Sequence, residues 1–150
     1  MTVHYLEDLE PGLRYRTGSR TLELAEIQAF AREFDPQPFH LDPEAAKHTL
    51  FGELVASGWH TMATTMRLIV DSDVQLGWGF LGAGVENIDW PNPVRPGDTL
   101  TAENEVIEVK PSRSKPDRGL ARIRTTTTNQ RGEPVLVVTA KVIVPRRQPA

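Results

Sequence analysis

The chain has 150 residues, with 17 lysines and arginines against 20 aspartates and glutamates, which gives a net charge of −3 at pH 7. We expect one domain, residues 1–150, because domains commonly have about 100–150 residues. No cysteine is present, which excludes a disulfide scaffold, a thiolate metal site and a cysteine nucleophile. No apolar run approaches the roughly 18–20 residues of a membrane span, and the acidic first residues do not resemble a signal peptide. We therefore expect a cytoplasmic protein that does not bind a membrane.

The charge is unevenly distributed along the chain. Residues 110–150 carry ten basic and two acidic residues, a net charge of +8, and residues 1–109 carry a net charge of −11. Such a division can indicate an anionic partner for the basic part. The alternative is that the two parts neutralise one another in the folded protein. Because the basic part has few aromatic residues, we do not expect it to bind nucleic acid.

The first predicted elements are a strand and a helix. A turn at Pro11-Gly12 leads into the strand, residues 13–19. Apolar side chains recurring on one face predict a helix over residues 24–34: Leu24, Ile27, Phe30, Ala31 and Phe34. Pro36 ends this helix, because the residue before a proline is disfavoured in the α region.

Two further helices are predicted before the chain changes to strands. Asp42 is the expected N-cap of a short helix that starts at Pro43 and includes residues 44–48. A longer helix is predicted over residues 58–70, with an apolar stripe made by Met62, Met66, Ile69 and Val70.

The remainder of the chain predicts four strands, over residues 85–90, 99–109, 120–128 and 135–144. In the second of these the alternation shifts phase after Val106, which indicates a β-bulge. Residues 129–132, Asn-Gln-Arg-Gly, predict a hairpin between the last two strands. Consecutive strands with short connections favour an antiparallel sheet, and the separate helices make the fold α+β. We expect this sheet to curve around the long helix.

The segment with the strongest indication of chemistry is residues 35–42, Asp-Pro-Gln-Pro-Phe-His-Leu-Asp. Two prolines restrict its backbone, so it can hold Asp35 and His40 at a fixed separation. A carboxylate and an imidazole held together form a general acid–base pair. The alternative is a rigid structural loop. We expect no metal site, because His40 and Asp42 have no third ligand at a usual zinc spacing.

The start of the long helix is the second candidate feature. Ser57-Gly58 precedes it, and the free N–H groups of a helix N-terminus suit a carbonyl oxygen that becomes negative during a reaction. The alternative is that Ser57 is only an N-cap and Gly58 a packing glycine. The segment lacks the G-x-S-x-G pattern of a serine nucleophile. The three tryptophans, Trp59, Trp78 and Trp90, are expected in the core or at an interface rather than as nucleotide-stacking residues.

Residues 35–46 resemble the hydratase motif of the MaoC-like, R-specific enoyl-CoA hydratase family, D-x-N-P-[aliphatic]-H-x-D-x-x-x-A. Residues 51–58 resemble the family's entry into the central helix, and residues 93–100, Pro-Val-Arg-Pro-Gly-Asp-Thr-Leu, resemble its PV-x-PGDTL turn. The sequence departs from the pattern at two positions. Gln37 stands where the family usually has asparagine, and Ser57 stands where a histidine often precedes the glycine.

The resemblance implies a hot-dog fold, in which an antiparallel sheet wraps a long helix, and assembly as a homodimer or a dimer-based oligomer. It implies reversible syn addition of water to a trans-2-enoyl thioester of coenzyme A or acyl-carrier protein, without a cofactor. Asp35 and His40 would hold and activate the water and together supply the base and acid functions, and the N–H of Gly58 would polarise the thioester carbonyl. Ser57 and Phe39 would lie beside the substrate.

Two other activities remain open for a protein of this fold. One is a thioesterase, although such enzymes place a carboxylate on or beside the central helix and residues 58–70 contain none. The other is a non-catalytic module that binds an acyl thioester or acts as a structural subunit.

Overall fold

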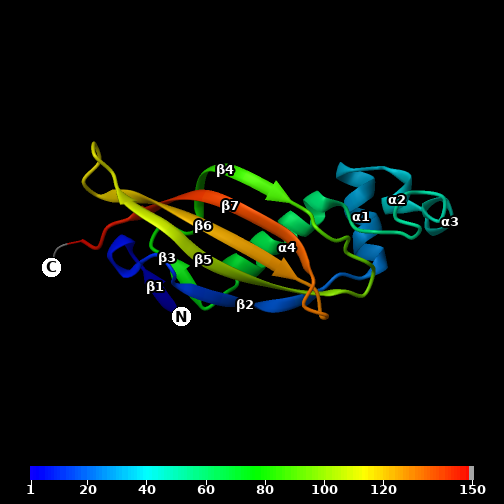
Figure 1. Ribbon diagram of the computed structural model, residues 1–150, viewed down its shortest axis with the longest axis horizontal. Coiled ribbons are helices and arrows are strands. Elements are labelled where there is room, and N and C mark those ends of the chain that lie inside the picture. Colours follow the sequence, from blue (N-terminus) through cyan, green and yellow to red (C-terminus); the bar gives the residue numbers. More distant parts are fainter. Residues whose placement is uncertain (149–150) are drawn as a thin grey trace.

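The computed structural model describes residues 1–148, and its main element is a five-stranded antiparallel sheet in the order β2-β5-β6-β7-β4 (Figure 1). These strands are β2 (Arg14–Thr21), β4 (Leu81–Asp89), β5 (Thr99–Pro111), β6 (Arg118–Thr128) and β7 (Pro134–Pro145). A small parallel pair, β1 (Thr2–His4) and β3 (Val74–Leu76), was not predicted from the sequence. The five-stranded sheet confirms the predicted antiparallel arrangement.

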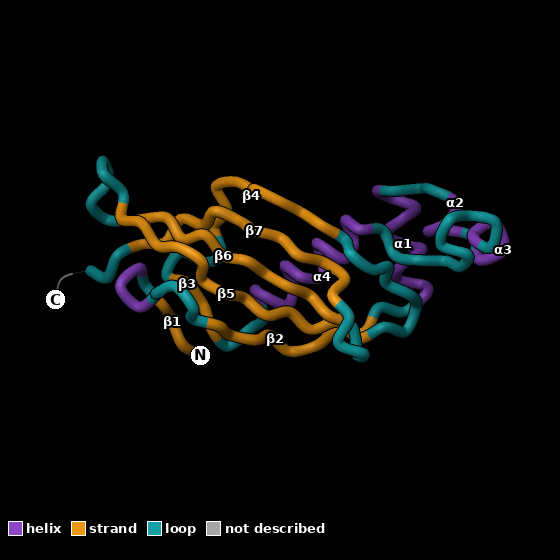
Figure 2. The backbone as a smooth tube through the Cα atoms, viewed as in Figure 1, coloured by secondary structure: helices purple, strands orange, loops and turns teal. Residues whose placement is uncertain are grey.

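The four α-helices of residues 1–148 lie in two places (Figure 2). The long helix α4 (Gly58–Val70) runs along one face of the sheet and contacts β2, β5 and β7. Three helices gather beyond one end of the sheet: α1 (Leu24–Phe34), α2 (Pro38–Leu41) and α3 (Pro43–Ala46). A short 3-10 helix, η1 (Leu6–Asp8), follows β1. This is the hot-dog arrangement of an α+β fold. No helix within residues 1–148 has the length and apolar character to cross a membrane.

The strands form where side chains alternate between the core and the outer face. In β6, Ala121, Ile123 and Thr125 point inward and are buried, and the residues between them are more exposed. The register of β5 shifts between Val106 and Glu108, which confirms the predicted bulge. The predicted hairpin is also confirmed, since residues 129–132 form the turn between β6 and β7.

The core between the sheet and α4 contains paired polar groups as well as apolar ones. The hydroxyls of Thr65 on α4 and Thr127 on β6 are 2.7 Å apart, and both residues are fully buried. Such pairs satisfy hydrogen bonds that burial would otherwise leave unmade. The three tryptophans lie outside this core, because each is between 41 and 57% exposed. The expectation of core positions for them is therefore wrong, and the alternative of positions at an interface stays a prediction.

Basic residues of the C-terminal part pair with acidic residues of the N-terminal part. Arg122 on β6 contacts Glu86 on β4 at 2.9 Å and Glu108 on β5 at 3.1 Å. Arg146 contacts Glu7, with 3.3 Å between the charged atoms. These contacts favour mutual neutralisation over an anionic partner as the reason for the charge division. The tip between β5 and β6 lies at the opposite end of the molecule from α1, α2 and α3 (Figure 1).

Candidate active site

The site begins where α1 ends. The N–H of Asp35 donates to the carbonyl of Ala31 at 2.9 Å, and Pro36 prevents a further helical turn. Gln37 is extended, with φ −99° and ψ 149°, as expected before a proline. Pro38 then starts α2, a single helical turn that carries Phe39 and His40. The sequence predicted a rigid loop here, and this turn was missed because it is too short to show a helical repeat.

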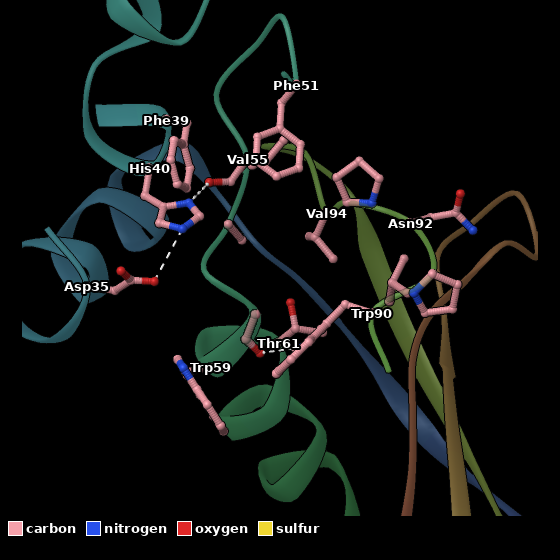
Figure 3. Close-up of a pocket in the computed structure, with 15 residues that line it drawn as sticks. Asp35, Phe39, His40, Phe51, Val55, Trp59, Thr61, Trp90, Asn92 and Val94 are labelled. Atoms are coloured by element: carbon pink, nitrogen blue, oxygen red, sulfur yellow. Dashed lines mark hydrogen bonds and ion pairs between the residues drawn. The ribbon is translucent and has the colours of Figure 1, made fainter. Parts of the chain in front are cut away.

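This local structure brings Asp35 and His40 together (Figure 3). The Nε2 atom of His40 lies 3.2 Å from Oδ2 of Asp35, and the two side chains are only 6 and 16% exposed. On the other side of the ring, Nδ1 lies 2.7 Å from the carbonyl oxygen of Val55. Because a carbonyl oxygen only accepts, Nδ1 carries a proton. The nitrogen of His40 that faces Asp35 is the other one, Nε2.

Asp35 is held by two further donors. The hydroxyl of Ser57 donates to Oδ2 at 2.7 Å, and the side-chain amide of Gln37 donates to Oδ1 at 2.5 Å. Burial acts to raise the pKa of Asp35, but hydrogen bonds from Gln37 and Ser57, together with the charge of His40, outweigh it. The pKa of Asp35 is consequently below its usual value. Asp35 is an ionised base at neutral pH.

The N-terminus of α4 supplies a free donor beside this pair. The hydroxyl of Ser57 accepts from the N–H of Trp59 at 3.2 Å, which confirms that Ser57 is the N-cap. The N–H of Gly58 has no acceptor within residues 1–148. Gly58 also lines the cavity described below. An N–H in this position can donate to an oxygen of a bound molecule.

Gly58 is enclosed by Trp90, which follows β4. The indole Nε1–H of Trp90 donates to the carbonyl of Gly58 at 3.0 Å. A Cβ atom added to Gly58 would lie only 2.6 Å from the indole ring. Both interpretations of the Ser57-Gly58 pair therefore have structural support, since Gly58 is closely packed and its N–H meets no acceptor in the described part of the chain.

A cavity of about 370 Å³ adjoins these groups (Figure 3). Asp35, His40 and Gly58 lie on its wall, and most of the other lining residues are apolar, including Phe39, Phe51, Val55, Pro93, Val94 and Val135. Phe39 lies on the cavity wall, and its contact with a substrate stays a prediction. Ser57 is not on the wall: it is 1% exposed and lies behind Asp35.

Residues 90–94 form a cavity wall that the sequence analysis missed. The N–H of Ala56 donates to the carbonyl of Val94 at 2.8 Å, which ties this wall to the segment before α4. The sequence did contain a signal for part of this wall, because the predicted turn at residues 93–100 starts within it. Sequence reasoning could not place that turn beside Gly58, since the contact joins segments more than 30 residues apart.

The cavity is not lined by a metal-ligand cluster. Within residues 1–148, no group of three histidine, aspartate or glutamate residues could hold a metal ion. His60, two residues after Gly58, does not line the cavity, and its ring stacks on Phe30 with 4.6 Å between ring centres. Among the described residues, Asp35 and His40 are the titratable side chains on the cavity wall.

Comparison with known proteins gives the same family as the motifs. The pattern of the MaoC-like domain matches residues 8–129. A solved structure, the MaoC-like dehydratase from Rhodospirillum rubrum, superposes with a TM-score of 0.94 and is 55% identical, covering 97% of this chain and 99% of that one.

Two relatives of similar length are named after an enzymatic activity. The chain is 30% identical over 155 residues to a 3-hydroxybutyryl-CoA dehydratase from Methylorubrum extorquens, covering 100% of this chain and 90% of the relative. It is 28% identical over 152 residues to an (R)-specific enoyl-CoA hydratase from Rhodospirillum rubrum, covering 98 and 96%. With this fold, these relatives and the matched domain pattern, the chain belongs to the MaoC-like dehydratase family.

Proposed function

We propose that the protein is a hydratase and dehydratase that reversibly adds water to a trans-2-enoyl thioester. The observation that carries the proposal is the contact of Asp35 with His40 on the wall of a largely apolar cavity. The free N–H of Gly58 lies on the same wall. An acid–base pair, an oxyanion donor and an apolar lining are what an acyl thioester requires.

In the hydration direction, the carboxylate of Asp35 takes a proton from water as the water oxygen bonds to C3 of the substrate. The electron pair of the C2–C3 double bond moves toward the thioester, whose oxygen becomes negative. The N–H of Gly58 stabilises this oxygen, and the positive end of α4 adds to the effect.

In this scheme His40 starts as an imidazolium, with protons on both ring nitrogens, and it completes the addition by donating the proton on Nε2 to C2 of the enolate. Asp35 is then protonated and His40 neutral, and proton transfer from Asp35 to His40 restores the pair. Both groups lie on one side of the cavity, 3.2 Å apart, so the hydroxyl and the proton add to the same face. Dehydration follows the same steps in reverse.

The proposal is tested with purified protein and trans-2-enoyl-CoA substrates of increasing chain length, following the loss of enoyl absorbance. We expect hydration by the native protein and its loss, by about 10²-fold or more, in Asp35→Asn and in His40→Gln. Glu33→Gln is a matched control, because Glu33 is an exposed acid on α1 near Asp35 in sequence. Its activity is expected to stay unchanged.

The outcomes of this assay separate the competing activities. Unchanged hydration in Asp35→Asn would contradict the proposal. Release of free thiol without hydration would indicate a thioesterase. Binding of crotonyl-CoA without either reaction would indicate a non-catalytic subunit. The same enoyl group presented on acyl-carrier protein shows which carrier the protein prefers.

We also infer that the protein forms a homodimer through β4. This strand pairs with β7 on one side and lies at the edge of the sheet. Leu81 and Val85 on β4 are 45 and 50% exposed, although both are apolar. An exposed apolar edge strand is a surface that another strand can extend. A second copy pairing along β4 would cover it, and light scattering of the purified protein tests this assembly.

A further inference from the structure

Ser57 has a different place in the structure from the one expected for a substrate-binding residue. It is 1% exposed and is not part of the cavity wall. Its oxygen accepts the N–H of Trp59 at 3.2 Å. Its hydroxyl proton points to Oδ2 of Asp35 at 2.7 Å. With the N–H of Trp59 as its donor partner, the hydroxyl is oriented so that its own proton is directed at Asp35.

The same oxygen of Asp35 also faces His40. Oδ2 therefore has two neighbours, the hydroxyl of Ser57 and Nε2 of His40, at 2.7 and 3.2 Å. A carboxylate accepts at about four lone-pair sites, two on each oxygen. Gln37 uses one site on Oδ1. One site, on Oδ1, is left for the water that Asp35 deprotonates.

The two other donors to Asp35 differ in their surroundings. Gln37 is exposed, so water competes with its amide for Oδ1 of Asp35 and weakens this hydrogen bond. Ser57 is 1% exposed, so solvent water does not compete with its hydroxyl for Oδ2 of Asp35. The buried hydrogen bond to a charged oxygen is the stronger of the two.

We propose that Ser57 is a positioning residue, whose hydroxyl holds Oδ2 of Asp35 against His40 and keeps the carboxylate oriented for proton transfer. The inference rests on the proposed hydration reaction and adds a residue that acts through Asp35 and does not touch the substrate. It also gives Ser57 two tasks, since the same side chain caps the helix whose first N–H binds the thioester oxygen.

The test compares three substitutions of Ser57. In Ser57→Ala we expect kcat to fall about 10- to 100-fold, the range for a lost hydrogen bond to a charged group. KM should change less than about twofold, because Ser57 lies off the cavity wall. Ser57→Thr keeps the hydroxyl and should recover most of kcat. Ser57→Cys keeps a side chain of similar size with only a weak donor. Its kcat should lie between those of the native protein and a variant without a donor, so it serves as the test if Ser57→Ala does not fold.

The pH profile separates positioning from simple loss of the helix cap. Removing the Ser57 hydroxyl should raise the pKa of Asp35, so the acid limb of kcat/KM moves to higher pH. Ser72→Ala is the matched control, since the buried hydroxyl of Ser72 donates to Ile69 and Val74 at the far end of α4. This control should lower the melting temperature and leave the acid limb in place.

A readout without substrate keeps this inference separate from the proposed function. The carboxyl carbon of Asp35 can be titrated by ¹³C NMR in the native protein and in the Ser57 variants. A midpoint that rises in Ser57→Ala supports positioning even if no enoyl thioester is hydrated, in which case only the proposed function fails. If Ser57→Ala lowers the melting temperature but leaves the midpoint, kcat and the acid limb unchanged, the inference is overturned.

Discussion

The close contact of Gly58 with Trp90 leads to a prediction for Gly58→Ala. The new Cβ would lie 2.6 Å from Cε2 and 2.7 Å from Nε1 of the indole, whereas ordinary contacts are 3.4–4 Å. The ring must therefore retreat by roughly 1 Å, which breaks the 3.0 Å hydrogen bond from Nε1 to the carbonyl of Gly58. Overpacking costs about 1–3 kcal/mol, and Trp90 is half-exposed and can move. We expect a loss of about 1–2 kcal/mol in the free energy of unfolding.

The assay is a double-mutant cycle measured by urea denaturation. In the Trp90→Ala background the ring is absent, so Gly58→Ala should cost nothing or stabilise by up to about 1 kcal/mol, because alanine favours the helix over glycine. The two changes should thus couple by about 1–3 kcal/mol. An equal cost of Gly58→Ala in both backgrounds would refute the packing argument. The hydration rate should fall together with stability in Gly58→Ala. Adding Trp90→Ala should not restore the rate, because removal of the indole also opens the cavity wall.

Three further predictions concern other parts of the fold. Burial is the main reason that the pKa of His60 is lowered in the folded protein. As the pH drops below ~6.5, the unfolded chain binds a proton at His60 before the folded protein does, so the free energy of unfolding should fall. His60→Phe should remove this pH dependence, which thermal melts at about pH 7.5 and about pH 5.5 can measure. Gly119→Ala should cost about 1–3 kcal/mol in urea denaturation, since its Cβ would lie 2.6 Å from the backbone oxygen of Lys110. Val85→Lys should convert the inferred dimer to monomer in light scattering, and an unchanged mass would contradict the β4 interface.

Local signals explain which elements could be predicted from the sequence. Pro36 sets the end of α1 and Ser57 sets the start of α4, and each does so through the residues next to it in the sequence. The strands β5, β6 and β7 follow from alternation that is visible within each segment. The separation of Asp35 and His40 was predictable for the same reason, because prolines restrict the five-residue span between them.

Elements that depend on distant contacts could not be predicted in this way. The start of β4 is missed because Leu81-Gly82-Ala83-Gly84 has almost no alternating side chains. The pair of β1 with β3 joins three-residue strands some 70 residues apart, and neither strand has a pattern of its own. Trp90 over Gly58, and Ser57 behind Asp35, likewise arise only when separate segments pack together.

The central claim is that Asp35 and His40 act from one side of a bound enoyl thioester. The most direct measurement is hydration of crotonyl-CoA in deuterium oxide, with the stereochemistry of the product determined by NMR. The account predicts one product, with the hydroxyl at C3 and the deuteron at C2 added to the same face, and no product from Asp35→Asn. Anti addition, a mixture of both additions, or an unchanged rate in Asp35→Asn would contradict it.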